Sequence, residues 1–412
     1  MKKNLLALTL SLGLLLTACG GPDYSAEVLS SGGRKTPVET ADLSGPGAQA
    51  ATDFAVKLLQ NVDDGGNILL SPVSVLSALA ITANGAAGDT KAQMEDVLGL
   101  PTTDLNAYLQ AYAAALPEDK DARCSLANSV WFRDDAHRLT VEQAFLDACA
   151  DYYGADLFRA PFDNSTLADL NAWVSDRTDG MIPTILDRIP DSAMVYLVNA
   201  LSFDGQWASV YRENQIHEDT FTTEDGTEQS AQMMYSQEFT YLEDGLATGF
   251  LKYYEGGTYA FAALLPNEGV SLEDYIASLT GQGLRDTLTF ARQEAVEAAI
   301  PQFTAQYDVE LSGILSELGM ADAFDASQAD FSAMGSSPDG PLYLSRVLHK
   351  TFLALDAQGT RAGAATVVEV DTGADAPGRA VYLDRPFLYL LVDCEANLPL
   401  FIGTVQSLEN ET

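Results

Sequence analysis

The apolar segments of this chain change character along its length, and this order limits the possible folds more than any other feature. Early segments have helical spacing: in the segment 52–62 the apolar residues Phe54, Leu58, Leu59 and Val62 fall on one side of a helix. Late segments, such as residues 259–266 and 385–393, are short, apolar and bounded by turn residues, which is typical of strands. Helices followed by strands predict a mixed α+β domain with extensive antiparallel sheet.

Two further helices are predicted before residue 100. Residues 71–86 have the composition of a buried helix, and residues 88–100 form the next one. Polar side chains are expected to cap the helices at their N-termini because they accept hydrogen bonds from free backbone N–H groups. The expected capping residues are Thr52 and Asp53 for the segment 52–62, and Asp89 or Thr90 for the segment 88–100.

The charge of the chain is strongly negative. Of its 412 residues 59 are acidic and 22 basic, which gives a net charge of −37. An acidic surface repels phosphate backbones, so we expect no nucleic-acid binding. The acidic residues are spread along the chain, which favours a solvated surface, and the length allows one large domain or two ordinary ones.

The N-terminus is typical of a bacterial lipoprotein. In residues 1–18, two lysines precede an apolar run, Leu5–Leu16, that is too short to span a membrane. The following LTAC resembles a lipobox whose lipidated residue is Cys19; ordinary secretion with an incidental cysteine is the alternative. We therefore expect a signal peptide at 1–18 and a protein outside the cytoplasm, lipid-anchored to the bacterial cell membrane at Cys19 or secreted. Residues 19–50, rich in small and polar types, are predicted to be a flexible tether to a domain at 51–412.

Motifs of common catalytic and metal sites are absent from the sequence. There is no GxSxG elbow, no GxxxxGK[ST] loop, and no HExxH or HxH pattern around the three histidines, His137, His217 and His349. No metal-finger spacing connects the three cysteines of the predicted domain, Cys124, Cys149 and Cys394, of which the last two lie in apolar surroundings and are predicted to be buried. We expect no enzyme, no metal and no cofactor, with a hydrolase as a distant alternative because triads are spatial.

Five ordered segments between about Thr52 and Val405 resemble signatures of the serpin family of protease inhibitors: Asn67–Leu100, Leu170–Leu186, Leu197–Trp207, Leu342–Thr360 and Arg385–Val405. The resemblance implies a serpin fold, with three β-sheets, eight to nine helices and an exposed reactive-centre loop. In this family the largest sheet opens and accepts the cleaved loop as an extra strand, and cleavage releases stored strain.

The resemblance also assigns residues to two regions of the sheet that opens. The polar cluster called the shutter matches Ser71, Ser74, Asn199 and His349, and the tryptophan at the top of the sheet, the breach, matches Trp207. Buried hydroxyl, amide and imidazole groups must satisfy one another, because each unpaired group costs about 1–3 kcal/mol. The alternative for His349 is an ordinary buried histidine of the core, and the alternative for Trp207 is an ordinary core aromatic residue.

The segment before residue 373 has the pattern of a strand with one uncharged face. Between Thr360 and Thr372 all three charges fall on alternate positions, at Arg361, Glu369 and Asp371. The resemblance makes eight mostly small residues the hinge: Gly359, Thr360, Arg361, Ala362, Gly363, Ala364, Ala365 and Thr366. A hinge of small residues favours entry of the loop between two packed strands, and therefore an inhibitory function. The family usually has glutamates at the positions of Ala357 and Arg361.

The reactive bond is predicted from family spacing. Counting from Gly359 places it at Gly373–Ala374, whereas counting back from residues 385–387 places it after Asp375. Small residues suit the shallow pocket of elastase-like or subtilisin-like proteases, and Arg379 lies too far along for a trypsin-like target. The VEVD that ends at Asp371 leaves open a protease that cuts after aspartate.

These features together predict a monomeric suicide substrate of extracellular serine proteases. Such a protein traps the protease as a covalent acyl-enzyme while its loop inserts into the main sheet. The alternative is a non-inhibitory serpin-like surface protein that acts by binding.

Overall fold

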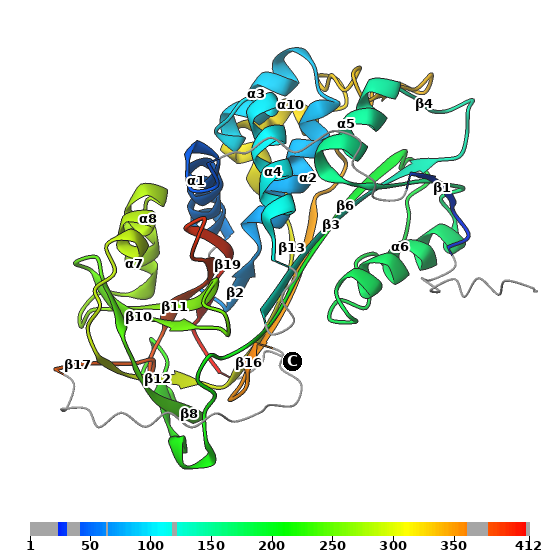
Figure 1. Cartoon of the computed structure of the whole chain (residues 1–412). Helices are drawn as coiled ribbons and strands as arrows, with labels where there is room; N and C mark the ends of the chain where they lie inside the picture. The colour runs from blue at the N-terminus through cyan, green and yellow to red at the C-terminus, as the bar shows by residue number, and fades with distance from the viewer. Residues whose placement is uncertain (1–23, 31–41, 63–64, 118–121, 361–377, 409–412) are drawn as a thin grey trace, which may run out of the picture.

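The chain folds into the predicted α+β architecture. The computed structural model describes residues 24–30, 42–62, 65–117, 122–360 and 378–408. Within these residues there are three large β-sheets, a small two-stranded sheet, and helices packed around them (Figure 1). The predicted fold class is therefore confirmed.

Eight regular helices and one kinked helical segment lie within the described residues. The eight are α1 Pro46–Val62, α2 Pro72–Asn84, α3 Gly88–Leu98, α4 Thr102–Ala115, α5 Gln143–Tyr153, α6 Asn164–Arg177, α7 Leu272–Ser278 and α8 Gly281–Thr289. The ninth segment consists of α9 Ser312–Leu315, a π-helical turn Ser316–Met320 and α10 Ala321–Phe324. It kinks at Gly319, whose φ of 127° is outside the helical range. This count agrees with the predicted eight to nine helices.

The predicted capping residues of two helices are wrong. Helix α1 begins six residues earlier than expected, at Pro46, and Thr52 lies in its interior with its Oγ1 donating to the Ala48 carbonyl at 2.8 Å. A proline in the first turn is well tolerated because its missing N–H has no helical partner there. Helix α3 follows Ala87, which has no side-chain cap, so Asp89 lies in the first turn and Thr90 further inside.

Part of the predicted tether belongs to the folded body. Strand β1 Glu27–Ser30 pairs antiparallel with β5 Asp156–Ala160, and the Tyr24 ring lies edge-on to Phe158, 5.4 Å between centroids. Ser25 donates to the Asp169 carboxylate at 2.6 Å. The polar composition concealed this strand because it is short and lies at a sheet edge. Together with α1 at Pro46, it interrupts the tether predicted over residues 19–50.

The main sheet has seven strands in the order β1-β5-β3-β6-β16-β15-β13. The remaining strands of this sheet are β3 Ala122–Arg133, β6 Val195–Gln206, β16 Gly359–Thr360, β15 Leu348–Leu355 and β13 Phe303–Glu310. Helix α6 covers one face, while α2 and α4 lie on the other (Figure 1). The aromatic residues Trp131, Phe158 and Trp173 fill the space under α6. Helices therefore pack against both faces of the sheet at β6.

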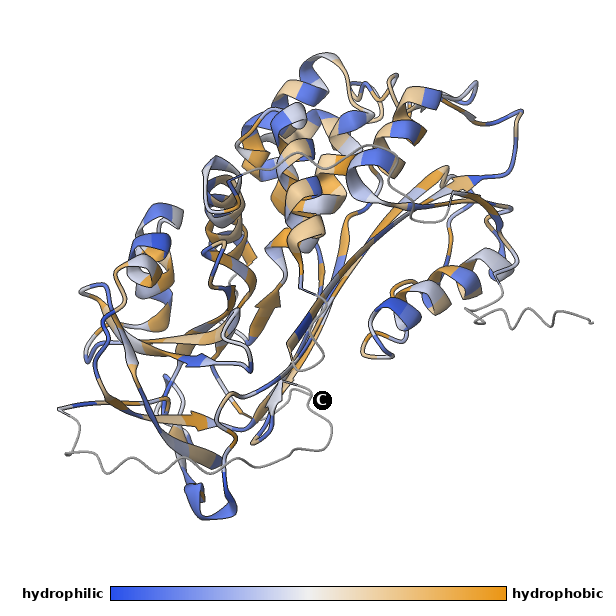
Figure 2. Ribbon diagram, viewed as in Figure 1, coloured by the Kyte–Doolittle hydropathy of each residue, from blue (hydrophilic) through white to orange (hydrophobic). Residues whose placement is uncertain are grey.

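Two smaller sheets complete the core. The six-stranded sheet contains β2 Ile68–Leu70, β19 Leu398–Val405, β18 Phe387–Asp393, β11 Tyr259–Pro266, β10 Ala247–Tyr253 and β9 Thr240–Glu243, in that order. The four-stranded sheet contains β17 Arg379–Tyr382, β12 Val296–Pro301, β8 Glu228–Glu238 and β7 Ile216–Thr222. Strands β11, β18 and β19 are buried at every position, which explains their almost continuous apolar sequence. Hydrophobic residues are frequent along the strands and the central helices (Figure 2).

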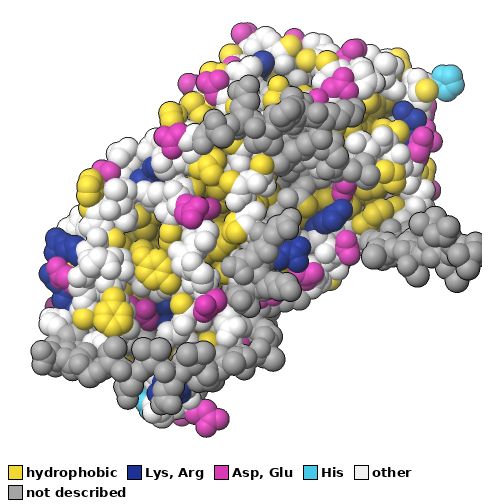
Figure 3. Space-filling view, in the orientation of Figure 1, with side chains coloured by type: hydrophobic (Ala, Val, Ile, Leu, Met, Phe, Trp, Pro, Cys, Tyr) yellow, Lys and Arg dark blue, Asp and Glu magenta, His cyan; other side chains and the backbone are white. Residues whose placement is uncertain are grey.

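The surface agrees with the predicted distribution of charge. Acidic side chains are scattered over the visible face and do not gather in one patch (Figure 3). Cys149 is buried as predicted, Cys394 is only half-buried, and neither forms a disulfide. Within the described ranges no helix is both long and apolar enough to cross a membrane.

Candidate functional site

The candidate site is a gap between two strands of the main sheet. Only the two-residue strand β16 lies between β6 and β15, where Gly359 pairs with Gln206, and Thr360 pairs with Gly205 and Leu355. Beyond Thr360 no described strand separates β6 from β15. A cavity of about 300 Å³, lined by residues of both strands, extends along this sheet gap.

The first residue of β16 can only be glycine. Gly359 approaches β6 so closely that a Cβ atom would lie 2.0 Å from the Gly205 carbonyl oxygen, and its φ of 157° is rare for other residues. On β6, opposite Thr360, a Cβ on Gly205 would lie 2.6 Å from the Phe203 ring. The two glycines therefore allow a strand to begin between β6 and β15.

Thr360 turns its side chain toward the core, as the alternation of charges predicts. It is 2% exposed. Its hydroxyl forms a hydrogen bond with the hydroxyl of Tyr254, which is fully buried. A charged or bulky residue at position 360 has no room in this environment.

Trp207 fixes the turn that leads into β16. Its backbone N–H donates to the Gln358 carbonyl and its indole Nε1 donates to the Asp356 carbonyl, both at 2.9 Å. The indole is 1% exposed and stacks on Tyr254 with 4.4 Å between ring centroids. The residue that the resemblance assigned to the breach therefore holds the chain where the gap opens.

A buried lysine beside Trp207 was missed by the sequence interpretation. Lys252 is 1% exposed; its Nζ lies 2.9 Å from a Glu238 carboxylate oxygen and 4.3 Å above the Tyr211 ring. Burial disfavours its charge, but Tyr211 and Glu238 more than offset this and raise the pKa of Lys252. Tyr211 in turn donates its backbone N–H to the Ala357 carbonyl at 3.0 Å. The ion pair thus packs on Tyr211, which holds the turn that leads into β16.

The four predicted shutter residues come together as two pairs. Ser71 donates its backbone N–H to His349 Nε2 at 3.0 Å, and the Ser74 hydroxyl donates to the Asn199 side chain. Burial lowers the pKa of His349 to about 4, so the ring is neutral at pH 7 and its Nε2 can accept this bond. Because Asn199 lies on β6 and His349 on β15, both edges of the gap are tied to helix α2 and its N-terminus.

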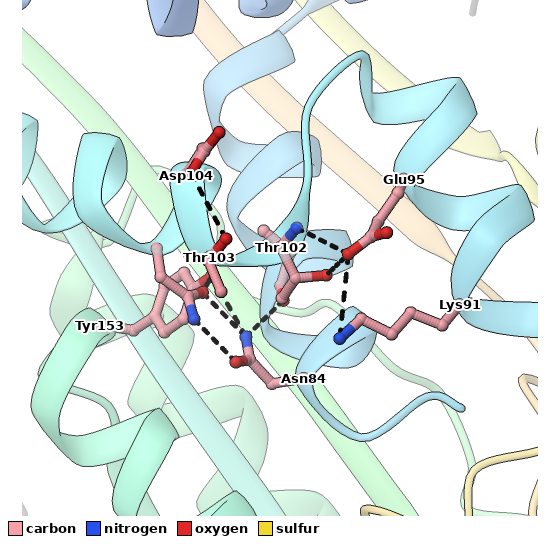
Figure 4. A network of polar contacts seen from close by, with 9 residues as sticks. Asn84, Lys91, Glu95, Thr102, Thr103, Asp104 and Tyr153 are labelled. Atoms are coloured by element: carbon pink, nitrogen blue, oxygen red, sulfur yellow. Dashed lines mark hydrogen bonds and ion pairs between the residues drawn. The ribbon is translucent and has the colours of Figure 1, made fainter. Parts of the chain in front are cut away.

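The polar contacts continue from the gap into the helices. Asn199 donates to the Asn128 side chain at 2.7 Å, and Asn128 donates to the Tyr153 carbonyl at 3.3 Å. The Tyr153 hydroxyl donates to Asn106, which exchanges two hydrogen bonds with Asn84 (Figure 4). A chain of side chains thus connects the sheet gap with α2, α4 and α5.

Helix α6 and the segment after it cover the outer side of the gap. The Trp173 indole and the Arg177 guanidinium both donate to Asp156 at 2.9 Å, which anchors α6 on β5. Apolar residues of the segment after α6, including Ile182, Ile185 and Leu186, line the same cavity as β6 and β15. A strand entering the gap therefore passes beneath this segment.

Several predicted site residues lie outside the described residues. These are the hinge residues Arg361, Ala362, Gly363, Ala364, Ala365 and Thr366, the reactive-bond residues Gly373 and Ala374, and the lipidation residue Cys19. They remain predictions. Among the residues that the structure describes, no group of three or more His, Cys, Asp or Glu side chains could hold a metal ion.

Comparison with known proteins identifies the family of this chain. The serpin (serine protease inhibitor) family model matches residues 49–408. Serpin B9 of Homo sapiens is 30% identical, covering 87% of this chain and 99% of its own, and serpin B10 of Otolemur garnettii is 29% identical, covering 86% and 97%.

Solved structures give the same result. The thermophilic serpin tengpin in its native state has 42% sequence identity and a TM-score of 0.87, covering 93% of this chain and all of its own. Its latent state has 39% identity and a lower TM-score of 0.80, covering 90% and 100%. Since the family model spans nearly all of the described residues and the relatives align over their full length, the chain belongs to the serpin family of serine protease inhibitors.

Proposed function

We propose that this protein inhibits extracellular serine proteases as a suicide substrate, by inserting its cleaved loop into the sheet gap. The observation that carries the proposal is β16. Thr360 already pairs with both β6 and β15, Gly359 pairs with β6, and the edges of the gap continue beyond them. The protease would supply the nucleophile that forms the acyl-enzyme, while this chain supplies the substrate and the strand.

The register of β16 supports insertion of the following residues. In an antiparallel pair, each step forward along one strand is a step back along the other, so the numbers of paired residues have a constant sum. For β16 this sum is 565 with β6 and 715 with β15. If the same register continued after insertion, Thr366 would come opposite Asn199 and His349. The small Ala362 would come opposite Phe203 and Leu353, two large side chains of the core. Uncharged positions of the inserted loop would then meet the core, and a hydroxyl would meet the polar cluster.

The proposed targets are elastase-like or subtilisin-like proteases, because small residues surround the expected reactive bond at Gly373–Ala374. The test is to mix the purified domain with an elastase, a subtilisin and trypsin, and to analyse the products on a denaturing gel. The first two should give a complex that resists SDS, with a mass close to the sum of both proteins. If all proteases give only cleaved protein, the inhibitory function is wrong.

We further propose that Cys19 anchors the protein outside the cytoplasm. The lipobox-like LTAC supports this, and mature proteins with two or more acyl chains bind membranes stably. In a bacterial host, the full chain should partition into detergent with the membrane fraction, and Cys19→Ser should not. Equal partitioning of both would favour plain secretion.

A non-inhibitory binding protein is the second candidate, favoured by Ala357 and Arg361 where serpins usually have glutamates. The fold permits this, because thyroxine-binding globulin in complex with thyroxine shares it at a TM-score of 0.76 and 22% identity. Thermal unfolding before and after cleavage of the loop separates the two functions. A loop that inserts raises the midpoint strongly, and a loop that only binds a partner leaves it unchanged.

A further inference from the structure

We propose that the cavity of the sheet gap binds a small amphiphile with an anionic head group, an apolar body and a hydroxyl at its far end, such as a hydroxylated medium-chain carboxylate. The head group would lie at Arg346, the apolar body beneath the segment after α6, and the hydroxyl beside Ser71. Both residues line the cavity, whose volume of about 300 Å³ is that of a small-molecule site. Binding is independent of the proposed function, and only its effect on inhibition rests on loop insertion.

Arg346 is the cation of the cavity wall that has no acidic partner among the described residues. Three basic side chains line the cavity. Two of them are paired, because Arg138 lies 2.9 Å from Asp339 and Lys350 lies 2.8 Å from Asp308. Arg346 is exposed. In a chain with a net charge of −37, an unpaired guanidinium at the exposed end of a cavity favours an anionic ligand.

The wall of the cavity next to Arg346 is apolar. Ile182, Ile185 and Leu186 of the segment after α6 line it, as does Leu348 of β15. The same four side chains pack in the hydrophobic cluster around Trp173, so the wall is already formed without a ligand. An aliphatic chain placed against this wall leaves water for apolar surroundings, which is favourable. The wall therefore fits the body of an amphiphile.

The buried end of the cavity holds a hydroxyl without a partner. Ser71 is 1% exposed, and its Oγ forms no hydrogen bond with any described residue. Ser71 is the N-cap residue of α2, where a serine hydroxyl ordinarily accepts a backbone N–H of the first turn, but its side chain forms no such bond here. An unpaired buried hydroxyl is unfavourable. A ligand hydroxyl beside it would remove this penalty.

His349 sets the polarity of the ligand at this end. It lines the cavity, and its Nε2 accepts the backbone N–H of Ser71 at 3.0 Å, so the neutral ring carries its hydrogen on Nδ1. A neutral hydroxyl can donate and accept hydrogen bonds beside these groups, whereas a carboxylate buried here would lose its hydration. The ligand therefore places its charge at the exposed end and its hydroxyl at the buried end.

A bound ligand would occupy the place that an inserting strand needs. The cavity is lined by residues of both β6 and β15, the two edges between which the loop would enter. Ligand binding and loop insertion would therefore exclude each other. In the presence of the ligand, more of the protein should be cleaved as a plain substrate and less protease should be trapped.

The buried end is tested by isothermal titration calorimetry of the intact chain with ω-hydroxydecanoate and with decanoate. The hydroxylated acid should bind about fivefold more tightly, because it forms an additional hydrogen bond at Ser71. Ser71→Ala should abolish this difference. Ser77→Ala should keep it, because Ser77 is another unpaired buried hydroxyl of α2 but does not line the cavity. Equal affinities of the two acids for the parent chain would overturn the proposed ligand.

The exposed end is tested with Arg346→Gln. This variant should bind both acids about tenfold more weakly and should bind decanol as the parent chain does, because only the acids carry a charge. Arg188→Gln is the matched control, since Arg188 is an exposed arginine of the segment after α6 that does not line the cavity. Thermal unfolding checks that each variant folds. Equal effects of the two substitutions would contradict a head-group site at Arg346.

The same titration after a verified cut in the loop separates this inference from the proposed function. Loss of binding on cleavage supports both, because the inserted loop would fill the cavity. Binding that persists after cleavage keeps the ligand site and contradicts insertion. If the intact chain binds neither acid but cleavage raises the thermal midpoint, insertion stands and the ligand site is wrong.

Discussion

At the scale of single residues, the site depends on close approach and burial more than on reactive groups. Gly359 and Gly205 allow the strand to begin, and Thr360 fills the space above Tyr254. None of these residues has chemistry of its own. Their effect is to hold the first two residues of a strand in a place where the rest can follow.

Thr360→Arg should convert the protein from inhibitor to substrate. The position is 2% exposed, so a guanidinium there would be buried without a partner, and the hinge could not stay between the strands. The measurement is the number of inhibitor molecules consumed per protease inactivated, which should rise at least tenfold. Thr360→Ser keeps the hydroxyl and serves as the control. Unchanged stoichiometry in Thr360→Arg would rule out entry of the hinge.

The shutter histidine should make the stability of the native state depend on pH. The pKa of His349 is about 4 in the folded protein and about 6.5 when unfolded, so between these values the unfolded chain binds more protons. The contribution of His349 to the free energy of unfolding is complete above about pH 6.5 and is lost as the pH falls toward 4. The total loss is on the order of 3 kcal/mol. Urea unfolding of the protein and of His349→Gln at pH 7.5 and 5 measures it. The variant should lose less stability on acidification, and equal losses would contradict the account.

The sequence predicted part of this chemistry and missed part. Ser71, Ser74, Asn199, His349 and Trp207 were assigned by resemblance, and the structure brings the first four together in two pairs. Tyr254, Lys252 and Asn128 were missed because their contacts join segments far apart in the chain. The hydroxyl of Tyr254, for example, meets Thr360 across 106 positions. The one signal of these contacts in the sequence was Lys252 itself, a lysine within an apolar strand.

At the scale of elements, strands of the two smaller sheets pack against the end of the gap at β16. Lys252 on β10 and Glu238 on β8 form the buried pair below the hinge, while Trp207 and Tyr211 bind the turn at Asp356–Gln358. The hinge is thereby connected to all three large sheets.

Lys252→Met should destabilise the native protein by about 3 kcal/mol, because it leaves Glu238 buried without its partner. Methionine is close to lysine in volume, so the loss reports charge and not a cavity. The midpoint of urea unfolding measures this effect. The double variant Lys252→Met with Glu238→Gln should recover most of the loss. A single variant as stable as the parent would show that the pair has no structural role.

The limits of sequence reasoning are plainest at element boundaries. The continuous apolar strands β11 and β18 were recognisable from pattern alone, whereas β15 was expected only from the family resemblance of Leu342–Thr360. Helix α1 was placed too late because its first turns consist of Pro, Gly, Ala and Gln, a composition shared with linkers. Strand β1 was missed because four residues at a sheet edge carry no periodic signal, and only Tyr24 and the Asp169 contacts reveal it.

At the scale of the whole molecule, the protein is a sheet that holds one place open for another strand. Seven strands surround the gap, and the short β16 marks both its entrance and its register. Helix α6 covers the gap on one side, and α2 ties its edges on the other. An energy gain from completing the sheet would drive the capture of a protease attached to the loop.

Amide hydrogen exchange before and after cleavage of the loop tests this account most directly. Among the described strands, none beyond β16 pairs with the N–H groups of β6 (Val195–Gln206) and β15 (Leu348–Leu355) that face the gap. After cleavage their exchange should slow by at least tenfold, because a new strand would pair with both edges. Exchange in β18, which is already paired on both sides, serves as the internal reference. Unchanged exchange along β6 and β15, with a verified cut in the loop, would contradict insertion.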